Sequence, residues 1–106
     1  MSVLAVNDAN FGSAIRPSGT TLVEFGARWC PPCKALHPIL EELSERYGER
    51  LAVIRVDCDD SPETAGQYGV MSMPTVIVFH DGQPVEKLVG LRPRSAYESV
   101  LGKYEG

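Results

Sequence analysis

The feature that most constrains the fold of this chain is the alternation of short apolar runs with segments of helical periodicity. The apolar runs contain many β-branched residues and are bounded by turn-forming residues, which is typical of buried strands. They cover residues 22–27, 51–57 and 75–79. Between the first two runs, residues 31–47 place leucines at helical spacing, and Gly48 ends this segment. A shorter helix is expected from Pro62 to just before Gly69.

The second half of the chain predicts a β-hairpin. Asp81-Gly82 separates the run at 75–79 from a further strand at 83–89, and Pro84 suits an edge strand because proline cannot donate to the ladder. Pro93 begins a last helix, whose inward stripe is formed by Tyr97, Val100, Leu101 and Tyr104. With a first strand over residues 3–6 and a helix over 10–15, the order is β-α-β-α-β-α-β-β-α. This order predicts an α/β fold, with a central mixed β-sheet flanked by helices on both faces.

A Cys-x-x-Cys motif, from Cys30 to Cys33, lies between the first long strand and the helix at 31–47. A thiol at a helix N-terminus experiences the positive end of the helix dipole, which favours the thiolate. The thiolate is the nucleophile in disulfide exchange, and a cysteine one turn further on lies close enough to resolve a mixed disulfide. The motif therefore predicts redox chemistry, although its spacing also fits a structural disulfide or half of a zinc site.

Two prolines stiffen this motif. Pro31 and Pro32 fit the first helical positions, because the N–H groups there have no intrahelical partner. Neither proline can donate to the sulfur of Cys30, so only donors from Cys33 onward remain. We expect Pro31 to shift the reduction potential relative to a Gly-Pro dipeptide. Pro38 lies inside the helix, where it removes one backbone hydrogen bond and is expected to kink the axis.

The length and charge of the chain exclude several classes of function. The 106 residues leave room for one domain, residues 1–106. A net charge of −4 without a basic cluster argues against a nucleic-acid partner, and no apolar segment is long enough to cross a membrane. The odd cysteine count and the lack of a secretory signal favour the reducing cytoplasm, where structural disulfides are rare.

The remaining polar candidates do not form a second motif. A zinc site needs four ligands, and outside the Cys-x-x-Cys motif only Cys58, His37 and His80 are available, so we expect no metal. Cys58 follows the strand at 51–57, where a free thiol is tolerated; regulatory oxidation or intermolecular pairing is the alternative. Both histidines are expected at the surface, and Asp59-Asp60 is expected to serve the entry into the next helix.

The segment Trp29-Cys30-Pro31-Pro32-Cys33-Lys34 resembles the active site of the thioredoxin family. The resemblance extends over nearly the whole chain, in the order and spacing of the family. The matching segments are Val23-Glu24-Phe25, Ala27, Trp29-Cys30, Pro32-Cys33-Lys34, Pro38-Ile39-Leu40, Val56-Asp57, Tyr68-Gly69-Val70, Met73-Pro74-Thr75 and Val89-Gly90. The resemblance implies the thioredoxin fold and a thiol–disulfide oxidoreductase.

The resemblance also implies roles for individual residues. Cys30 would be the exposed nucleophile and Cys33 the buried resolving thiol. Pro74 corresponds to the family's cis-proline, which faces the disulfide, and the backbone of Met73 would pair with bound substrate like an added strand. The residues expected to line the docking groove are Trp29, Pro31, Met73, Pro74, Gly90 and Leu91. For Met73 and Leu91, simple packing is the alternative interpretation.

Glu24 takes the position of the family's buried acid, which is usually aspartate. A carboxyl group in an apolar strand should have a raised pKa, which suits it to accept the proton of Cys33 through a water molecule. The alternative places Glu24 on a solvent-facing side of the strand. The lysine often found near this acid is replaced by Val53, so we expect no stabilising cation there. Gly26 stands where the family usually has tryptophan.

The expected reaction is dithiol–disulfide exchange with the disulfides of client proteins. The resemblance implies that an NADPH-dependent flavoprotein, thioredoxin reductase, recycles the redox-active Cys30–Cys33 disulfide. It also implies a monomer with no bound cofactor. Two alternatives remain open: a more oxidising exchanger, suggested by Pro31 and Glu24, and a binding module that uses the groove around Trp29 and Pro74.

Overall fold

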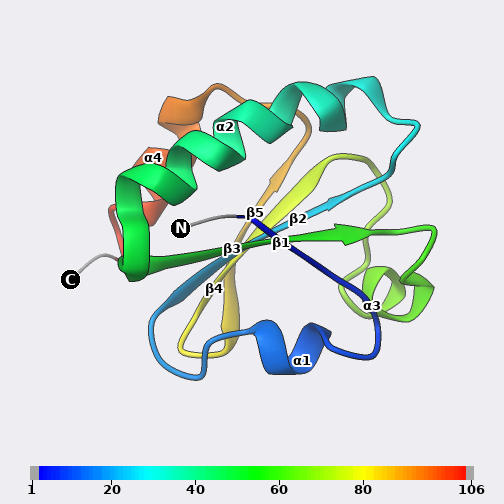
Figure 1. Cartoon of the computed structure of the whole chain (residues 1–106), viewed down its shortest axis with the longest axis horizontal. Helices are drawn as coiled ribbons and strands as arrows, with labels where there is room; N and C mark the ends of the chain where they lie inside the picture. Colours follow the sequence, from blue (N-terminus) through cyan, green and yellow to red (C-terminus); the bar gives the residue numbers. More distant parts are fainter. Residues whose placement is uncertain (1–2, 105–106) are drawn as a thin grey trace.

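Five strands form one mixed sheet in the spatial order β1-β3-β2-β4-β5 (Figure 1). The computed structural model describes residues 3–104. The elements are β1 Leu4–Val6, α1 Phe11–Ala14, β2 Thr20–Gly26, α2 Pro31–Tyr47, the 3-10 helix η1 Gly48–Arg50, β3 Leu51–Asp57, α3 Pro62–Gln67, β4 Thr75–His80, β5 Gln83–Val89 and α4 Arg94–Leu101. Strand β3 pairs in parallel with β1 and β2, whereas β4 runs antiparallel to β2 and β5. The predicted mixed α/β fold is confirmed.

The expected elements are present in the expected order, and most of their ends differ by no more than two residues. The last helix is the exception, because it ends at Leu101 and Tyr104 lies beyond it rather than on its inward stripe. Strand β2 begins at Thr20 rather than at residue 22, because Thr20 and Thr21 pair with β3 on one side and β4 on the other. These β-branched polar residues fit a strand but do not extend an apolar run. Helix α1 is limited to four residues, Phe11–Ala14.

Two hydrophobic layers enclose the sheet. Helices α2 and α4 cover one face, and α1 and α3 cover the other (Figure 1). Strand β2 is buried along its whole length, so its alternate side chains enter both layers. The buried core on the α2 and α4 side consists of Leu22, Leu36, Leu40, Leu43, Leu51, Val53, Val76, Val78, Leu88, Tyr97 and Leu101. The core on the other side consists of Val6, Phe11, Val23, Phe25, Ile54, Val56, Ile77 and Phe79.

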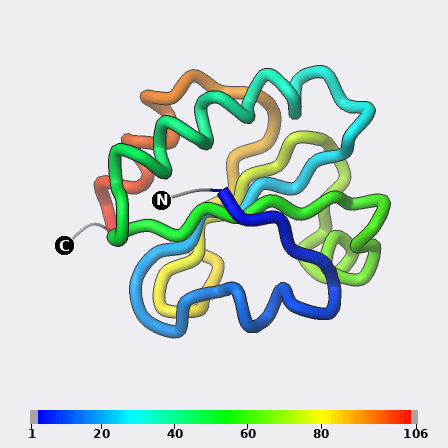
Figure 2. The backbone as a smooth tube through the Cα atoms, in the orientation of Figure 1, coloured from blue at the N-terminus to red at the C-terminus, as the bar shows by residue number. Residues whose placement is uncertain are grey.

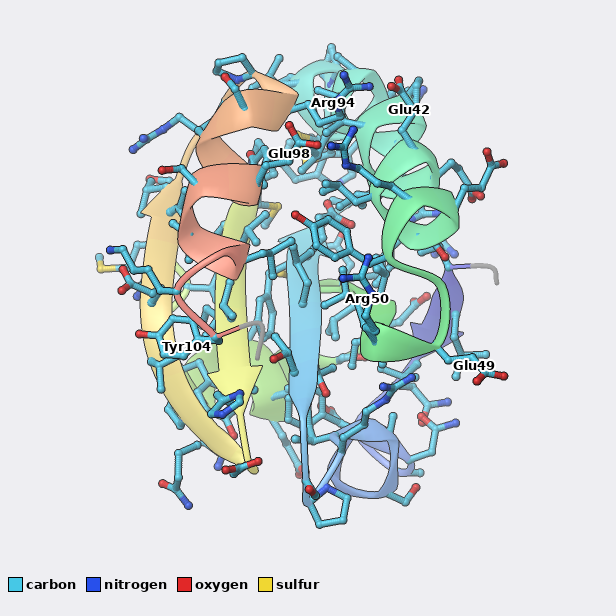
Figure 3. The ribbon with its side chains drawn as sticks, turned by 90° about the vertical axis from the view of Figure 1, so that its left-hand side faces the viewer. Glu42, Glu49, Arg50, Arg94, Glu98 and Tyr104 are labelled. Atoms are coloured by element: carbon cyan, nitrogen blue, oxygen red, sulfur yellow. A yellow bond between two sulfur atoms is a disulfide. The ribbon has the colours of Figure 1, made fainter. Side chains whose placement is uncertain are left out.

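Helix α2 packs through the predicted leucine stripe and is linked to α4 by ion pairs. Arg94 pairs with Glu42, and Glu98 Oε2 lies 3.3 Å from Nε of Arg46 on α2 and 3.7 Å from Nε of Arg94 within α4. Figure 3 shows Glu42 on α2 facing Arg94 and Glu98 on α4. Helix α2 continues through Pro38, whose ring is exposed. A kink at Pro38 stays a prediction.

The hairpin has the geometry that its sequence predicts. Asp81 and Gly82 both have positive φ angles, 52° and 83°, and His80 pairs with Gln83 across the turn. Positive φ at both central residues favours glycine and aspartate in two-residue hairpin turns. Pro84 lies in β5, which is an edge strand. The loops that follow β2 and β3, and the loop before β4, lie together at the right-hand end of the sheet (Figure 2).

Candidate active site

The Cys-x-x-Cys motif lies in this loop cluster, at the first turn of α2. Cys30 is the N-cap residue, and its Sγ accepts a hydrogen bond from the backbone N–H of Cys33 at 3.3 Å. Pro31 and Pro32 occupy the first two helical positions and are exposed. Because neither proline has a backbone N–H, Cys33 is the first residue of the helix that can donate a backbone hydrogen bond, as the sequence predicts. Cys30 and Cys33 form a disulfide with a Cα–Cα distance of 5.3 Å.

The expected exposure of Cys30 is wrong for the disulfide form. Its side chain is 3% exposed, and that of Cys33 is fully buried. The two cysteines form a small apolar cluster with Ala27, and Met73 packs against it. These contacts cover the sulfur of Cys30, which the family resemblance led us to expect at the surface. Cys30 is therefore only slightly more accessible than Cys33 in the oxidised protein.

Across from the first turn of α2, the site is bounded by the turn before β4 and the turn after β5, which are joined by a hydrogen bond. The Met73–Pro74 peptide bond is cis, as the family resemblance implies. The carbonyl of Pro74 accepts a hydrogen bond from the N–H of Gly90 at 2.8 Å. Gly90 has a φ of 88°, a conformation that favours glycine. The hydrogen bond holds the turn after β5 against the turn before β4, beside the disulfide cluster that Met73 contacts.

The rim of the site is apolar and exposed. Trp29 is 65% exposed, and Val89 and Leu91 are each nearly half exposed. The indole Nε1 of Trp29 donates to Asp59 Oδ2 at 2.7 Å, so the ring is held at a defined place. The sequence assigned Asp59 to helix entry and missed this contact. No local pattern links residues so far apart in the chain.

Glu24 lies beneath the motif and is 2% exposed. Because side chains alternate along a strand, Glu24 shares with Leu22 and Gly26 the face of β2 that α2 covers. Burial raises the pKa of Glu24 to about 7, and the guanidinium of Arg55 partly opposes this rise. The expected burial and raised pKa are present, and the alternative of a solvent-facing Glu24 is wrong.

The expectation that Glu24 lacks a neighbouring cation is also wrong. In the parallel register of β2 and β3, Val53 lies opposite Leu22, whereas Arg55 lies opposite Glu24. Arg55 Nε is 3.5 Å from Glu24 Oε1. The Arg55 side chain is 39% exposed, so its charge remains partly hydrated while it stabilises the buried carboxylate. Register, rather than sequence position alone, determines which residue faces the acid.

A cleft of about 530 Å³ connects Glu24 with the surface on the β1 and β3 side. Its polar lining includes Arg55, Asp57 and His37. Burial, followed by the charge of Arg55, lowers the pKa of His37. His37 is thus half-buried in the cleft rather than a freely solvated surface histidine. The cleft gives the carboxyl of Glu24 a route for proton exchange with solvent.

Comparison with known proteins identifies the family. The family model for thioredoxin matches residues 2–103. Thioredoxins of Staphylococcus aureus strains Mu50 and MW2 are 47% identical over 104 residues, which cover 98% of this chain and 99% of theirs. This chain belongs to the thioredoxin family. A mutant thioredoxin from Halobacterium salinarum NRC-1 has a similar structure, with a TM-score of 0.90 and 32% identity, covering 99% of this chain and 92% of that one.

Family membership and geometry together establish the chemistry. The thioredoxin fold places two cysteines at disulfide distance on a helix N-terminus, within a family of thiol–disulfide oxidoreductases. The protein is therefore a thiol–disulfide oxidoreductase that acts through Cys30 and Cys33. Its redox-active group is this pair of side chains.

Cys58 does not belong to this thioredoxin site. Its backbone N–H donates to the carbonyl of Gly26 at 2.8 Å, and its side chain is partly buried against the core of the opposite face. Burial, together with the neighbouring carboxylate of Asp57, raises the pKa of the Cys58 thiol to about 11. A thiol with so high a pKa is a poor nucleophile at neutral pH, which favours the interpretation of Cys58 as a tolerated free cysteine.

The described residues, 3–104, offer neither a metal site nor a membrane-spanning helix. Within this part of the chain, no three or more histidine, cysteine, aspartate or glutamate side chains are grouped so that they could hold a metal ion. None of the described helices is long and apolar enough to cross a membrane. His80, a possible ligand by sequence, lies away from the motif, where its Nδ1 is 3.1 Å from Thr20 Oγ1.

Proposed function

We propose that the whole chain, residues 1–106, acts as one thioredoxin domain that reduces disulfides of client proteins. In this proposal the protein works as a monomer in the cytoplasm, and an NADPH-dependent thioredoxin reductase returns it to the dithiol form. The match to the thioredoxin family supports the client class, the monomeric state and the reductase partner, and the acidic sequence is compatible with the cytoplasm.

The first step is attack by the thiolate of Cys30 on one sulfur of the client disulfide. A bond forms between Cys30 and that sulfur, the client disulfide breaks, and the other client sulfur leaves as a thiolate that takes up a proton. The N-cap position of Cys30 supports this role, since the N–H of Cys33 points at its sulfur and the helix dipole favours negative charge there.

The second step is resolution by Cys33. The carboxylate of Glu24 accepts the proton of the Cys33 thiol, and the resulting thiolate attacks the sulfur of Cys30. The mixed disulfide breaks, and the second client sulfur leaves as a thiolate that takes up a proton. Two electrons have then moved from the Cys30–Cys33 dithiol to the client. A pKa of about 7 suits Glu24 to accept and release protons near neutral pH.

Client docking is assigned to the apolar rim. Trp29, Pro31 and Leu91 present exposed surface on either side of the disulfide, and Met73, Pro74 and Gly90 form the wall between them. An extended client segment would pair with the backbone at Met73. Packing of Met73 against the disulfide cluster is compatible with this role.

The observation that carries the proposal is the position of a buried carboxyl group beneath a cysteine pair at a helix N-terminus. The test is a coupled assay in which oxidation of NADPH by a bacterial thioredoxin reductase is followed with insulin as the disulfide substrate. Cys30→Ser and Cys33→Ser should abolish turnover, and Cys58→Ser is the matched control that should retain it. Activity in the Cys30→Ser protein, or none in the wild type, contradicts the proposal.

The reduction potential separates a reductant from the more oxidising exchanger. The potential of the Cys30–Cys33 pair can be followed through the fluorescence of Trp29, the only tryptophan of the chain, across dithiothreitol buffers. We expect a value near or below about −250 mV, close to the thioredoxin range. A value above about −200 mV would favour an oxidant or isomerase.

A further inference from the structure

Gly26, the last residue of β2, has no conformational reason to be glycine. It is buried, it pairs in register with Asp57 of β3, and its φ angle is not positive. Glycine inside a strand loses more backbone entropy on folding than other residues and provides no side chain for packing. Its presence in a central strand indicates that space at this position is needed by a neighbour.

The neighbours that need the space are Glu24 and Cys33. A Cβ atom built on Gly26 would overlap Oε2 of Glu24, at a distance that real Cβ atoms do not show. The same atom would lie 3.0 Å from Sγ and 3.2 Å from Cβ of Cys33. The carboxylate of Glu24 and the sulfur of Cys33 therefore both lie against the face of Gly26.

We propose that Gly26 is a positioning residue, which provides the space that holds the Glu24 carboxylate against Cys33. A glutamate is one methylene longer than an aspartate, and the missing side chain at residue 26 accommodates this extra length. The inference rests on the proposed role of Glu24 as the acceptor of the Cys33 proton. It adds that Glu24 and Gly26 act as a pair matched in size.

The surroundings explain why the carboxylate cannot make room for a methyl group without leaving Cys33. Glu24 is 2% exposed, with Cys33 fully buried on the helix above it. Val76 of β4 lies opposite Glu24 on one side and Arg55 of β3 on the other. The open direction is toward Arg55 and the cleft, since Glu24 and Arg55 both line that cavity. A displaced carboxylate would move away from the sulfur.

The experiment is a double-mutant cycle of Gly26→Ala and Glu24→Asp, made singly and together. Gly66→Ala is the matched control, because a Cβ at this glycine of α3 meets no atom within 4 Å. Two readouts are taken for each protein. The first is the rate at which Cys33 resolves a mixed disulfide, measured by stopped flow between pH 5 and pH 9. The second is the pKa of the acid at residue 24, measured by NMR of its carboxyl carbon.

We expect Gly26→Ala to slow resolution about tenfold at pH 7 when residue 24 is glutamate, part of the contribution of a general base. The same change should alter the rate of the Glu24→Asp protein by less than about twofold, because the shorter acid does not reach the added methyl group. The pKa of Glu24 should fall toward the ordinary range in Gly26→Ala, since the displaced carboxylate gains water and moves closer to Arg55. Gly66→Ala should leave both quantities unchanged.

Equal effects of Gly26→Ala in the two backgrounds, or an unchanged Glu24 pKa, would overturn the inference. If Gly26→Ala does not fold, the double variant should fold, because the shorter acid removes the overlap with Oε2 of Glu24 and leaves only the close contacts with Cys33, which need shifts of a few tenths of an ångström. A double variant that also fails to fold shows that the glycine serves Cys33 instead. Failure of the proposed function gives a different result. In that case the pKa of Glu24 would still fall in Gly26→Ala, while Glu24→Gln would resolve mixed disulfides at the wild-type rate.

Discussion

The buried carboxyl of Glu24 is the residue on which most of the site depends. Burial favours its neutral form, whereas Arg55 across the β2–β3 pair favours the charged form. These two effects leave the pKa of Glu24 at about 7. A small change in its burial or in its distance from Arg55 therefore changes it from a proton donor to a proton acceptor at physiological pH. An unperturbed glutamate would be fully charged there and a weaker base.

Glu24→Gln should therefore slow resolution by Cys33 about 100-fold at pH 8, because the amide cannot accept the thiol proton. In the wild type the rate should rise as pH increases through about 7, the pKa of the acid that becomes the base. The variant should lose this rise. Stopped-flow measurements across pH check the prediction, with exposed Glu41→Gln on α2 as the control. A variant that keeps the pH profile of the wild type would remove Glu24 from the mechanism.

At the scale of the element, the first turn of α2 combines a nucleophile, two prolines and one N–H donor to sulfur. The prolines preset the helical φ angle, and the backbone N–H of Cys33 donates the N-cap hydrogen bond to the sulfur of Cys30. The missing N–H groups reduce the partial positive charge that the turn offers to a thiolate. Helix start and redox tuning thus depend on the same residues.

Pro31→Gly restores one N–H at this helix end. We expect the added partial charge to stabilise the thiolate of Cys30 and to make the reduction potential less negative by about 10–20 mV. Redox titration by Trp29 fluorescence measures this shift. An unchanged potential would show that Pro31 does not tune the pair, and a more negative one would show that Pro31 acts in the opposite direction, by a cause other than the missing N–H.

Helix α3 depends on a residue that is remote in the chain. Ser61, at the N-cap position, makes no capping bond. Instead Asp8 accepts from the N–H of Thr64 at 2.8 Å, from the Thr64 hydroxyl, and from the N–H of Glu63 at 3.2 Å. The hydroxyl bond of Thr64 is the main cause that lowers the pKa of Asp8. This contribution to stability is present above the ordinary pKa of aspartate and is lost as pH falls.

Asp8→Ala should lower the melting temperature at pH 7 by roughly 5 °C, because two backbone donors of α3 lose their partner. The difference between variant and wild type should shrink as the pH is lowered toward 3. Scanning calorimetry at several pH values tests both statements. Ser61→Ala, which removes no capping bond, is the control; a larger loss from Ser61→Ala than from Asp8→Ala would contradict the assignment.

At the scale of the whole molecule, the same Glu24 makes stability depend on pH. The folded state binds a proton at residue 24 up to about pH 7, whereas the unfolded chain releases it near 4.5. The folded state therefore holds more protons between these values, and the free energy of unfolding decreases as pH rises through this window. The decrease attributable to Glu24 should be about 3 kcal/mol.

Urea unfolding of the oxidised protein at pH 5, 6, 7 and 8 tests this linkage. Glu24→Gln should remove the decrease and should be the more stable protein at pH 8, because no charge then has to be buried. Wild-type and Glu24→Gln curves that stay parallel over this range would show that the acid is charged throughout. Glu45→Gln, at an exposed position of α2, should follow the wild type.

The sequence by itself determined the order of elements, the hairpin turn at Asp81-Gly82 and the position of Cys30 and Cys33 at a strand–helix junction. It also predicted that Glu24 is buried. These features depend on periodicity, turn preferences and capping, which are properties of residues adjacent in the chain. The structure confirms them, with shifts of one or two residues at most element ends and a last helix that ends at Leu101, before Tyr104.

Tertiary structure alone decided which residues surround the cysteines. The register of β2 and β3 places Arg55, not Val53, beside Glu24, and Asp8 caps a helix 55 residues away. Packing against Ala27 and Met73 buries Cys30, and the space at Gly26 becomes meaningful only beside Glu24 and Cys33. A one-residue change of register would reverse the face of every side chain in a strand, so such contacts are set by the pairing of distant segments rather than by local sequence.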